Sequence, residues 1–391
     1  MQNSLAALEE PDVPKGLPIG PLPIDCDPDD TTPIRWVRMP NGAGCWAVSD
    51  YRLARQVLAD PRFSRAAALA PDVARVASID PSPDSIISLD GTAHARLRRI
   101  VAGAFTERRV TALRPVIEDR VRELLDELAA GDQPADLVAG LAAPLPLSVL
   151  CHMLGIPVTD QESFREWVPV LFDLDGAGPE NRARAFRITH YMAKLIGQKR
   201  REPGDDLISA LIQAADTEGR LTNRELVTLS LSLLMAGYDS TADQITLAFL
   251  GLLHDPARAD ALRADPGLVP AEVEELLQTN SSAPLSFSRA VTEPVRVADV
   301  TIRPGEPVLV FLLGANRGLR RSEGTPAGAH LAFGHGVHRC LGAPLARLQL
   351  ATVIRLTLDR FPRLELAEDV DGLHWKPAAA TRGLTRLHVR C

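Results

Sequence analysis

The sequence predicts a mostly α-helical fold with small β-sheets, and three observations support this prediction. Apolar residues recur with the period of a helix over most of the chain from Tyr51 to Ala215. A central apolar segment of about thirty residues lacks the polar face of a surface helix. Runs typical of strands are confined to the region before residue 50 and the region beyond residue 294. Because the chain shows no repeats and no clear linker, we expect a single domain over residues 1–391.

Composition narrows the function classes. The chain has 391 residues, 46% of them hydrophobic, and a net charge of −7, which argues against nucleic acid as the main partner. No apolar stretch approaches the roughly 18 residues that span a bilayer, and the acidic start lacks the basic region of a signal peptide. Five scattered cysteines fit a reducing compartment. We expect a cytoplasmic protein without a membrane or nucleic-acid partner.

The first elements follow from local composition. Prolines and aspartates between Pro11 and Pro33 predict an extended arm over residues 1–33. A hairpin is expected from Ile34–Met39 and Cys45–Val48, which are joined through Asn41-Gly42. Helical periodicity then predicts helices at Tyr51–Leu58, Thr92–Phe105 and Val110–Ala129, and an apolar segment, Leu137–Leu154, broken by Pro144 and Pro146.

The central helix has clear start and stop signals. Thr222 and Glu225 form a capping box, in which each side chain satisfies a free backbone amide. Pro256 ends the helix near His254. Its middle reads Ala236-Gly237-Tyr238-Asp239-Ser240-Thr241. An acid and two hydroxyls in a buried helix are costly unless they are satisfied or used.

Further strands are expected at Val295–Ile302 and Val308–Leu312, and again near Leu364–Leu366 and Leu384–Val389. Between these strand regions lies a glycine-rich loop, Phe333 to Gly342, directly before a helix that begins at Ala343. Gly334 and Gly336 of the loop can take φ > 0. Gly342 leaves room for the amides of the first helical turn to point at Cys340. With Arg339 and His338 beside it, Cys340 is predicted to be a thiolate.

Other interpretations of Cys340 are weaker. A zinc site needs further cysteines or histidines at short spacing, and no C-x-x-C or H-x-x-x-H pair occurs. A nucleophilic cysteine needs a base, and the sequence identifies none. Lone cysteines are usually small buried hydrophobes, which is what we expect of Cys26, Cys45, Cys151 and Cys391.

The pattern FGxGxHxCxG of residues 333–342 resembles the haem-ligand loop of the cytochromes P450. The resemblance implies the P450 fold, in which the haem lies between a long central helix and the cysteine loop. It implies Cys340 as the iron ligand, with Phe333, Gly334 and Gly342 at the cofactor. Haem b (iron protoporphyrin IX) is the implied cofactor and O2 the implied cosubstrate.

The central helix extends the resemblance. Residues 236–241 resemble the A-G-x-[D/E]-T-[T/S] segment of P450s, whose acid and alcohol deliver protons during activation of dioxygen. Asp239 takes the acid position and Ser240 the alcohol position, and Thr241 beside them is the third residue that the resemblance predicts to be catalytic. Serine in place of threonine keeps the hydroxyl but loses a methyl that restricts the rotamer, so we expect looser coupling. The alternative is a helix kink whose hydroxyls bond preceding carbonyls.

Four residues are predicted to hold the haem propionates. His94 and Arg98 lie on one helix face at i,i+4, and the family's H-x-x-x-R pair binds one propionate. Arg289 aligns with the family arginine that binds the other, and His338 adds a donor. Taken alone, an H-x-x-x-R pair is more often a solvated helix face.

The resemblance also implies which residues line a substrate pocket and which kind of protein donates electrons. Five residues would line an apolar substrate pocket: Ser232, Met235, Ala236, Leu285 and Phe287. Ala66–Ser88 would form a mobile wall above it. No flavin or nicotinamide fingerprint is visible, so electrons should come from a ferredoxin and its reductase. Four arginines are either a docking patch for that donor or scattered solvated side chains: Arg96, Arg99, Arg339 and Arg347.

The chain departs from the family pattern at two places. Glu275 is followed by Gln278 where the family's E-x-x-R has arginine, and Gly318–Ala329 is a short twelve-residue segment without the family's second arginine. Either the region has been rebuilt, which we favour, or haem loading is impaired. In a rebuilt site Gln278 would bond Glu275, and the substitutes for the lost arginine would be Arg317, Arg320 or Arg321.

We therefore predict a haem-thiolate monooxygenase that inserts oxygen from O2 into a small organic, natural-product substrate. Two alternatives remain at this point. One is a P450-like helper or binding protein without oxygenase activity, and the other is a P450 that catalyses oxidative coupling.

Overall fold

The structure, a computed structural model, describes residues 20–22, 27, 30, 32–39, 42–71, 73, 82–167, 179–217, 219–319, 328–376 and 381–391. Most of the predicted arm over 1–33 lies outside these residues. So do much of the predicted wall at 66–88, residues 320–327 of the short segment, and with them Arg320 and Arg321.

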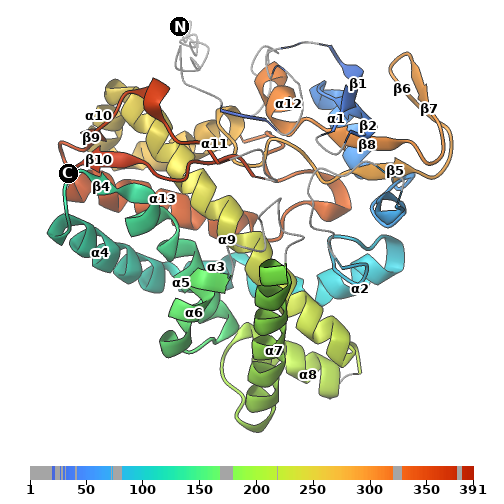
Figure 1. Cartoon of the computed structure of the whole chain (residues 1–391), viewed down its shortest axis with the longest axis horizontal. Coiled ribbons are helices and arrows are strands. Elements are labelled where there is room, and N and C mark those ends of the chain that lie inside the picture. Colours follow the sequence, from blue (N-terminus) through green and yellow to red (C-terminus); the bar gives the residue numbers. More distant parts are fainter. Residues whose placement is uncertain are drawn as a thin grey trace, which may run out of the picture.

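Helices dominate the described chain, as predicted (Figure 1). One difference is that the helix expected at Val110–Ala129 is two helices, because Pro115 starts a new one in its first turn. Another is that Pro144 begins a helix instead of breaking one. The helices are α1 Tyr51–Ala59, α2 Gly91–Ala102, α3 Glu107–Ala112, α4 Arg114–Ala130, α5 Pro144–Leu154, α6 Gln161–Trp167, α7 Pro179–Arg201, α8 Leu207–Asp216, α9 Asn223–His254, α10 Pro256–Ala264, α11 Val269–Thr279, α12 Leu312–Leu319 and α13 Ala343–Arg360.

The β-structure of the described residues is small and is divided among sheets of five, three and two strands, and the five-stranded and three-stranded sheets lie at opposite sides of the molecule (Figure 1). A five-stranded sheet has the order β1-β2-β8-β5-β3, with the predicted hairpin at its edge and β8 parallel to β2. The strand predicted at Val308–Leu312 ends at Val310, because α12 begins at Leu312. The strands are β1 Ile34–Arg38, β2 Gly44–Val48, β3 Phe63–Ser64, β4 Ala135–Asp136, β5 Arg289–Val291, β6 Val295–Val297, β7 Val300–Ile302, β8 Pro307–Val310, β9 Glu365–Leu366 and β10 His388–Arg390.

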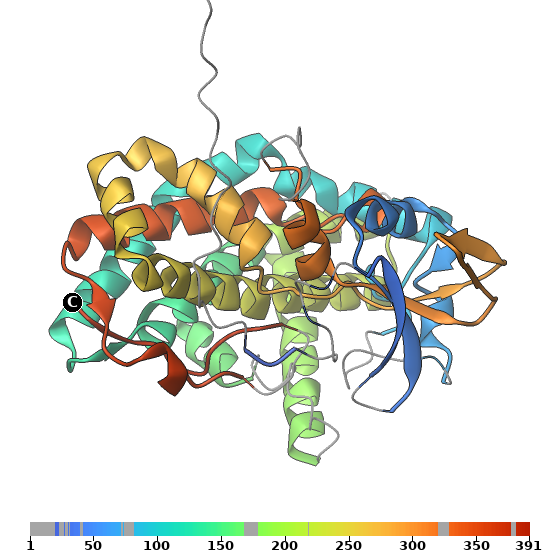
Figure 2. The same ribbon diagram turned by 90° about the horizontal axis from the view of Figure 1, so that it is seen from above.

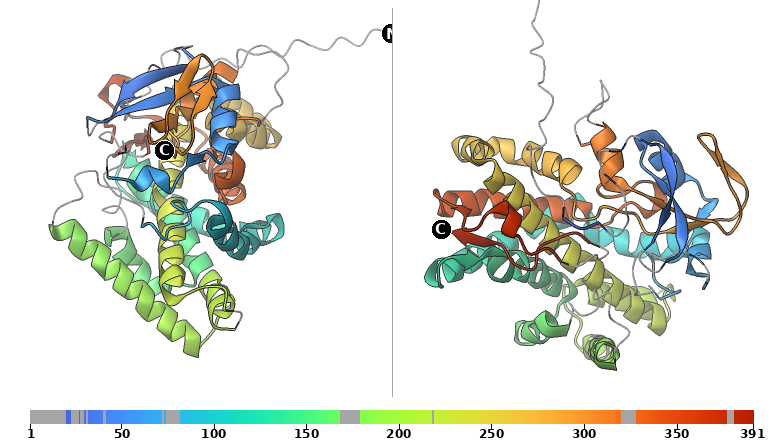
Figure 3. Two further views of the ribbon diagram at one scale, coloured as in Figure 1. Left: turned by 90° about the vertical axis from the view of Figure 1, so that its right-hand side faces the viewer. Right: turned by 45° about the horizontal axis from the view of Figure 1, so that its top comes forward.

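Helix α9 is the axis of the molecule. Its 32 residues cross the whole fold (Figures 1 and 2), and the predicted capping box of Thr222 and Glu225 is formed at its start. Helices α5, α7, α8, α10, α11 and α13 all contact it. The five-stranded sheet lies on one side of this axis, and α7 extends on the opposite side (Figure 3).

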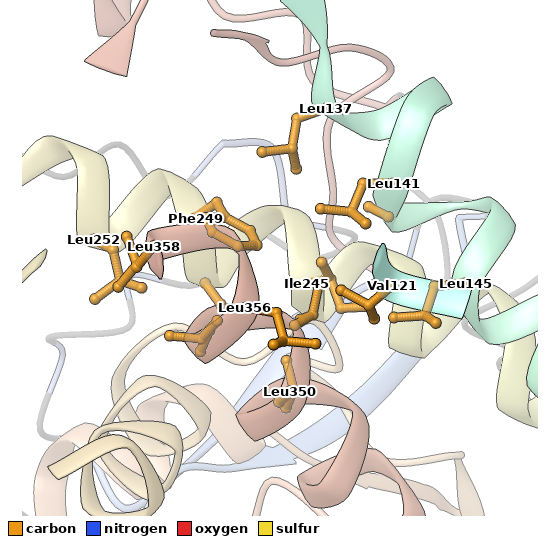
Figure 4. Close-up of a cluster of buried hydrophobic side chains, with 14 of the residues drawn as sticks. Val121, Leu137, Leu141, Leu145, Ile245, Phe249, Leu252, Leu350, Leu356 and Leu358 are labelled. Atoms are coloured by element: carbon orange, nitrogen blue, oxygen red, sulfur yellow. The ribbon is translucent and has the colours of Figure 1, made fainter. Parts of the chain in front are cut away.

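The largest core cluster fixes α9 between α4, α5 and α13 (Figure 4). Ile245 and Phe249 of α9 are fully buried among leucines of the neighbouring helices. Each such side chain contributes about 1.5–3 kcal/mol on burial. This packing holds the second half of α9 rigidly, so that its polar middle has a fixed position.

Among the described residues, no helix combines the length and the apolar character that a membrane span requires.

Candidate functional site

The cysteine loop is closed by its own backbone. The Gly334 amide donates to the Leu331 carbonyl at 2.8 Å, and the Cys340 amide donates to the Phe333 carbonyl at 2.9 Å. The second bond joins residues seven positions apart and brings the two ends of the motif together. The loop therefore presents Cys340 at the start of α13, where the sequence places it.

Two glycines of the loop have the predicted left-handed backbone. Gly334 has a φ of 68° and Gly336 a φ of 72°. At Gly336 the space is restricted too, because a Cβ would lie 2.5 Å from the Leu58 carbonyl oxygen at the end of α1. Only glycine lets the loop approach α1 this closely.

The sulfur of Cys340 has the predicted electrostatic surroundings. The amides of Gly342 and Ala343 donate to it, and the guanidiniums of Arg339 and Arg98 lie close enough to stabilise a thiolate. Desolvation outweighs these groups, so the pKa of the Cys340 thiol lies above its ordinary value. The thiolate predicted from the sequence is therefore not favoured in the chain alone. A coordinated metal ion deprotonates such a thiol.

The middle of α9 is only partly buried, and one row of its residues forms an open face. Ser232, Ala236 and Ser240 follow one another at i,i+4, and Met235 lies beside them; Ala236 is exposed and the other three are half-buried. From Thr241 to Leu253 every residue of the helix is buried. The open face therefore ends at Ser240, and Thr241 is outside it.

The Ser240 hydroxyl donates to the Ala236 carbonyl at 2.8 Å, and the Ser240 carbonyl accepts from the Ser282 hydroxyl at 2.9 Å. This is the back-bonding expected from the alternative interpretation of the motif. It is compatible with the proton-relay interpretation, because a serine hydroxyl can rotate from a carbonyl to another acceptor.

Asp239 points to a different part of the chain. One carboxylate oxygen accepts from Lys376 Nζ and the other from Thr381 Oγ1, both at 2.8 Å. One turn further along α9, the buried Asp243 also contacts Lys376 Nζ, at 2.7 Å. Gly383 makes this approach possible, since a Cβ there would lie 2.0 Å from Asp243 Oδ1.

These side chains form a charged cluster of one lysine and two carboxylates. Desolvation, and then the neighbouring Asp239, raise the pKa of Asp243. Desolvation lowers the pKa of Lys376, but the two carboxylates outweigh it and raise that pKa. Sequence analysis missed Lys376 and Thr381, because they lie 137 and 142 residues away from Asp239 in the chain.

The four predicted propionate ligands lie in one region. The His94 and His338 rings are 4.2 Å apart between centroids, and His338 Nε2 lies 3.4 Å from a carboxylate oxygen of Asp90. Arg98 donates to the Arg339 carbonyl at 2.7 Å, and Arg289 donates to the Phe63 carbonyl at 3.2 Å. Arg289 is buried, and its Nε has no hydrogen-bond partner among the described residues.

This region suits a group with carboxylates. Desolvation, followed by the nearby His338 and Arg98, lowers the pKa of His94 to about 4, so His94 is neutral at pH 7. The cations available to an anion here are the guanidiniums of Arg98 and Arg289, because each donates to a neutral carbonyl. A haem carries two propionates, and the orphaned donor of Arg289 together with the open face of α9 fits such a group.

The other predicted pocket residues differ in position. Phe287 is 52% exposed, which is unusual for so large an apolar side chain. Leu285 is buried and bridges to Phe311 within a core cluster of the sheet region. Ser232 bonds the hydroxyl of Ser85 at 3.1 Å, so the described end of the predicted wall does reach α9.

Helix α11, which carries Gln278 in place of the family arginine, forms an ion pair through Glu274. Arg347 of α13 donates to both carboxylate oxygens of Glu274, at 2.6 and 2.9 Å, and His330 Nε2 lies 3.1 Å from Glu274. Desolvation raises the pKa of Glu274, but Arg347 and His330 outweigh it and lower the pKa to about 2. These bonds tie α11 to α13 and to the segment before the cysteine loop.

Gln278 donates to the Asn316 backbone carbonyl at 3.3 Å, and the expected bond to Glu275 is replaced by this one. Arg317 is buried on α12. Of the suggested docking patch, Arg96 pairs with Glu225 and Arg347 with Glu274. Arg99 and Arg339 are exposed, whereas Arg96 and Arg347 are half-buried.

Comparisons with known proteins agree with this geometry. A model of the family Cytochrome P450 matches residues 178–375. The chain is 38% identical over 375 residues to cytochrome P450 107B1 of Saccharopolyspora erythraea, covering 92% of both chains. It is 39% identical over 370 residues to the mycinamicin IV hydroxylase/epoxidase of Micromonospora griseorubida, covering 92% of this chain and 93% of that one. The solved structure of the putative thioether synthase SgvP superposes with a TM-score of 0.86 at 36% identity, over 93% of this chain and 94% of that chain. The chain belongs to the cytochrome P450 family.

Proposed function

We propose that this protein is a haem-thiolate monooxygenase that inserts one oxygen atom from O2 into a natural product. The observation that carries the proposal is the cysteine loop, in which backbone bonds and two left-handed glycines present Cys340 to the helix amides of Gly342 and Ala343. P450 relatives of this chain include an enzyme named as a hydroxylase/epoxidase of mycinamicin IV and one named as a nocardicin C N-oxygenase.

The proposed cofactor is haem b. Cys340 would bind its iron through sulfur, and His94, Arg98, Arg289 and His338 would bind its propionates. When bound, the haem supplies activation of dioxygen, which an electron-donating thiolate favours. Because the Arg98 and Arg289 guanidiniums each donate to a neutral carbonyl among the described residues, the propionates would give them charge-assisted bonds.

The chain's own contribution to proton delivery lies on α9. Asp239 is held by Lys376 and Thr381 on its two oxygens, which keeps its carboxylate turned from the open face until one of these bonds opens. Ser240 lies on the open face, with a hydroxyl that can move from the Ala236 carbonyl to an acceptor in the pocket. We assign Asp239 the acid role and Ser240 the role of passing the proton. Thr241 is buried beyond the open face and would stabilise the helix.

The substrate would lie against the open face of α9, with Ser232, Met235 and Ala236 below it and Phe287 at the side. Leu285 would support this wall from within the core.

Electrons would come from a ferredoxin and its reductase, docked near the exposed Arg99 and Arg339. Four described cysteines are free thiols, which supports a cytoplasmic location. The proposed domain organisation is a single domain over residues 1–391, with 1–33 as its N-terminal arm, and the contacts of α9 with elements from both halves of the chain support it.

The test is incorporation of isotope from ¹⁸O2. Mycinamicin IV and nocardicin C, named for two relatives, start a panel screened by the spectral shift that substrate binding causes. A compound that shifts the spectrum is then incubated with a bacterial ferredoxin, its reductase, NADPH and ¹⁸O2. One labelled oxygen in the product supports the proposal. A coupled product without label would favour oxidative coupling, and a haem-free protein would favour the helper function.

Ser240→Ala tests the proton role separately. The ratio of product formed to NADPH consumed should fall severalfold, while the substrate-induced shift persists. Ser240→Thr is the matched control, because it restores a hydroxyl at the same carbon, and it should keep or raise the ratio. An unchanged ratio in Ser240→Ala would remove Ser240 from the relay.

A further inference from the structure

One further buried cation, Arg65, lies near the predicted propionate ligand Arg289. Arg65 follows β3, which pairs antiparallel with β5 through Phe63 to Val291 and Ser64 to Ala290. Continuing this register places Arg65 opposite Arg289. Both side chains are buried, with 4% and 5% exposure. Like charges opposite each other on paired strands destabilise a sheet, and burial makes the repulsion stronger.

No carboxylate bonds either guanidinium within the described part of the chain. Arg65 donates to the carbonyls of Ile87 and Ser288, and Arg289 donates to the carbonyl of Phe63. Asp90 is the acidic group whose charge acts on both arginines. Its own hydrogen bonds go to Ser64, to the Ala66 amide and to His338.

The charges are therefore out of balance. Desolvation, followed by the charge of Arg289, lowers the pKa of Arg65 to about 10. Desolvation lowers the pKa of Arg289 to about 10 as well. Both stay charged at pH 7 and share one carboxylate among the described residues, so these described groups carry an excess positive charge. An unpaired buried charge is costly, and a bound anion would remove the cost.

The guanidinium of Arg65 is also fixed in direction. It lies over the Phe287 ring, 5.1 Å from the centroid, and its Nε is held by Ile87 at 3.1 Å. Its Nη2 makes no hydrogen bond to a described residue, and the same holds for Nε of Arg289. These two donors on neighbouring guanidiniums are available to the two oxygens of a carboxylate.

We propose that Arg65 and Arg289 form a two-arginine carboxylate site, in which Arg65 is a carboxylate-binding residue additional to the four ligands named above. The proposal rests on the haem-binding function. The carboxylate belongs to a haem propionate or to an acidic substrate held beside Phe287, and the experiment separates these sources.

The first arm titrates haem into the apoprotein and compares it with haem dimethyl ester, which lacks free propionates. The wild type should prefer the free acid. Arg65→Met should lose about tenfold of this preference, the worth of one charge-assisted hydrogen bond, and Arg65→Lys should recover part of it. Arg62→Met is the control, because Arg62 is a neighbouring arginine paired with Asp60, and its preference should equal that of the wild type.

The second arm measures spectral shifts of the haem-loaded protein with lauric acid and with 1-dodecanol. If the site binds a substrate carboxylate, Arg65→Met should lower the ratio of affinities for lauric acid and 1-dodecanol by about tenfold. Its preference for haem over haem dimethyl ester should then equal that of the wild type. A loss in either arm supports the carboxylate site and identifies its source. Unchanged preferences in both arms, in variants with wild-type circular dichroism, would overturn the proposal. Failure of the wild type to bind haem at all would instead overturn the proposed function.

Discussion

The cysteine loop and the centre of α9 are both polar, yet they are built by different means. The loop is shaped by its backbone, through the bond from Cys340 to Phe333 and the left-handed Gly336 against α1. The centre of α9 depends on side chains from elsewhere, since Asp239 is held by Lys376 and Thr381 near the end of the chain.

This difference has a physical consequence. A site determined by backbone bonds within the loop and by close backbone packing against α1 tolerates little change in conformation, which suits a fixed metal ligand. A site that depends on distant ion pairs has bonds that can open one at a time, which suits a group that takes up and releases protons. We therefore expect glycine substitutions to destabilise the loop, and changes of charged residues to destabilise the centre of α9.

The largest effect is expected from Lys376→Met. It leaves Asp239 and Asp243 close together without their cation, and breaking a buried ion pair costs about 3–5 kcal/mol of unfolding free energy. Denaturant unfolding measures the loss. The double variant Lys376→Met/Asp243→Asn should recover a large part of it, because one of the two carboxylates is removed. No recovery would mean that Lys376 acts through packing and not through its charge.

The cluster also predicts a pH dependence. Because the pKa of Asp243 is raised in the folded protein, the folded state binds more protons there than the unfolded state does. Stability contributed by this group therefore falls as pH rises above the ordinary pKa of 3.8. In Asp243→Asn this decline should be smaller, as measured by melting temperature between pH 4 and pH 7.

Gly336→Ala tests the loop. The substitution combines a strained φ with a Cβ 2.5 Å from the Leu58 oxygen, so we expect a loss of about 2–3 kcal/mol and a lower haem content. Gly334→Ala is the comparison, since its φ is similar but a Cβ there meets nothing within 4 Å. Its cost should be about 1 kcal/mol. Equal costs would show that the approach to α1 does not define the loop.

A smaller effect is expected from Glu274→Gln, which removes the charge that Arg347 and His330 bond. The pair is partly exposed, so we expect a loss of about 1–2 kcal/mol at pH 7. Because the pKa of Glu274 is lowered to about 2, its contribution is complete above about pH 4.5 and is lost as pH falls toward 2. The variant should lack this decline. Glu272→Gln, which breaks the ion pair between α11 and Arg258 of α10, should leave haem content unchanged.

The smallest effect is expected from Gln278→Arg. The Glu274–Arg347 pair already joins α11 to α13, so restoring the family arginine should change haem content by less than about a tenth. Haem per polypeptide, measured by the pyridine haemochrome method, decides this. A sharp rise would show that the natural chain loads haem poorly and that the region is impaired.

The sequence predicts the elements that depend on neighbouring residues, and it does not predict contacts between residues far apart in the chain. Helix α9 with its capping box, the hairpin and the cysteine loop were predicted, because each depends on residues near one another in the sequence. Lys376 and Arg65 were missed, since an isolated lysine or arginine resembles a surface residue until the fold buries it. Strand β3 has two residues, too few for an alternating pattern. Pro115 and Pro144 were misread as interior or breaking residues because proline also starts helices.

The central claim is that Cys340 binds haem iron through its sulfur, and the absorption spectrum of the reduced protein with carbon monoxide tests it most directly. We predict a red-shifted Soret band typical of thiolate ligation in the wild type, and its absence in Cys340→His. A wild-type band typical of a neutral ligand, or the same spectrum in both proteins, would contradict it.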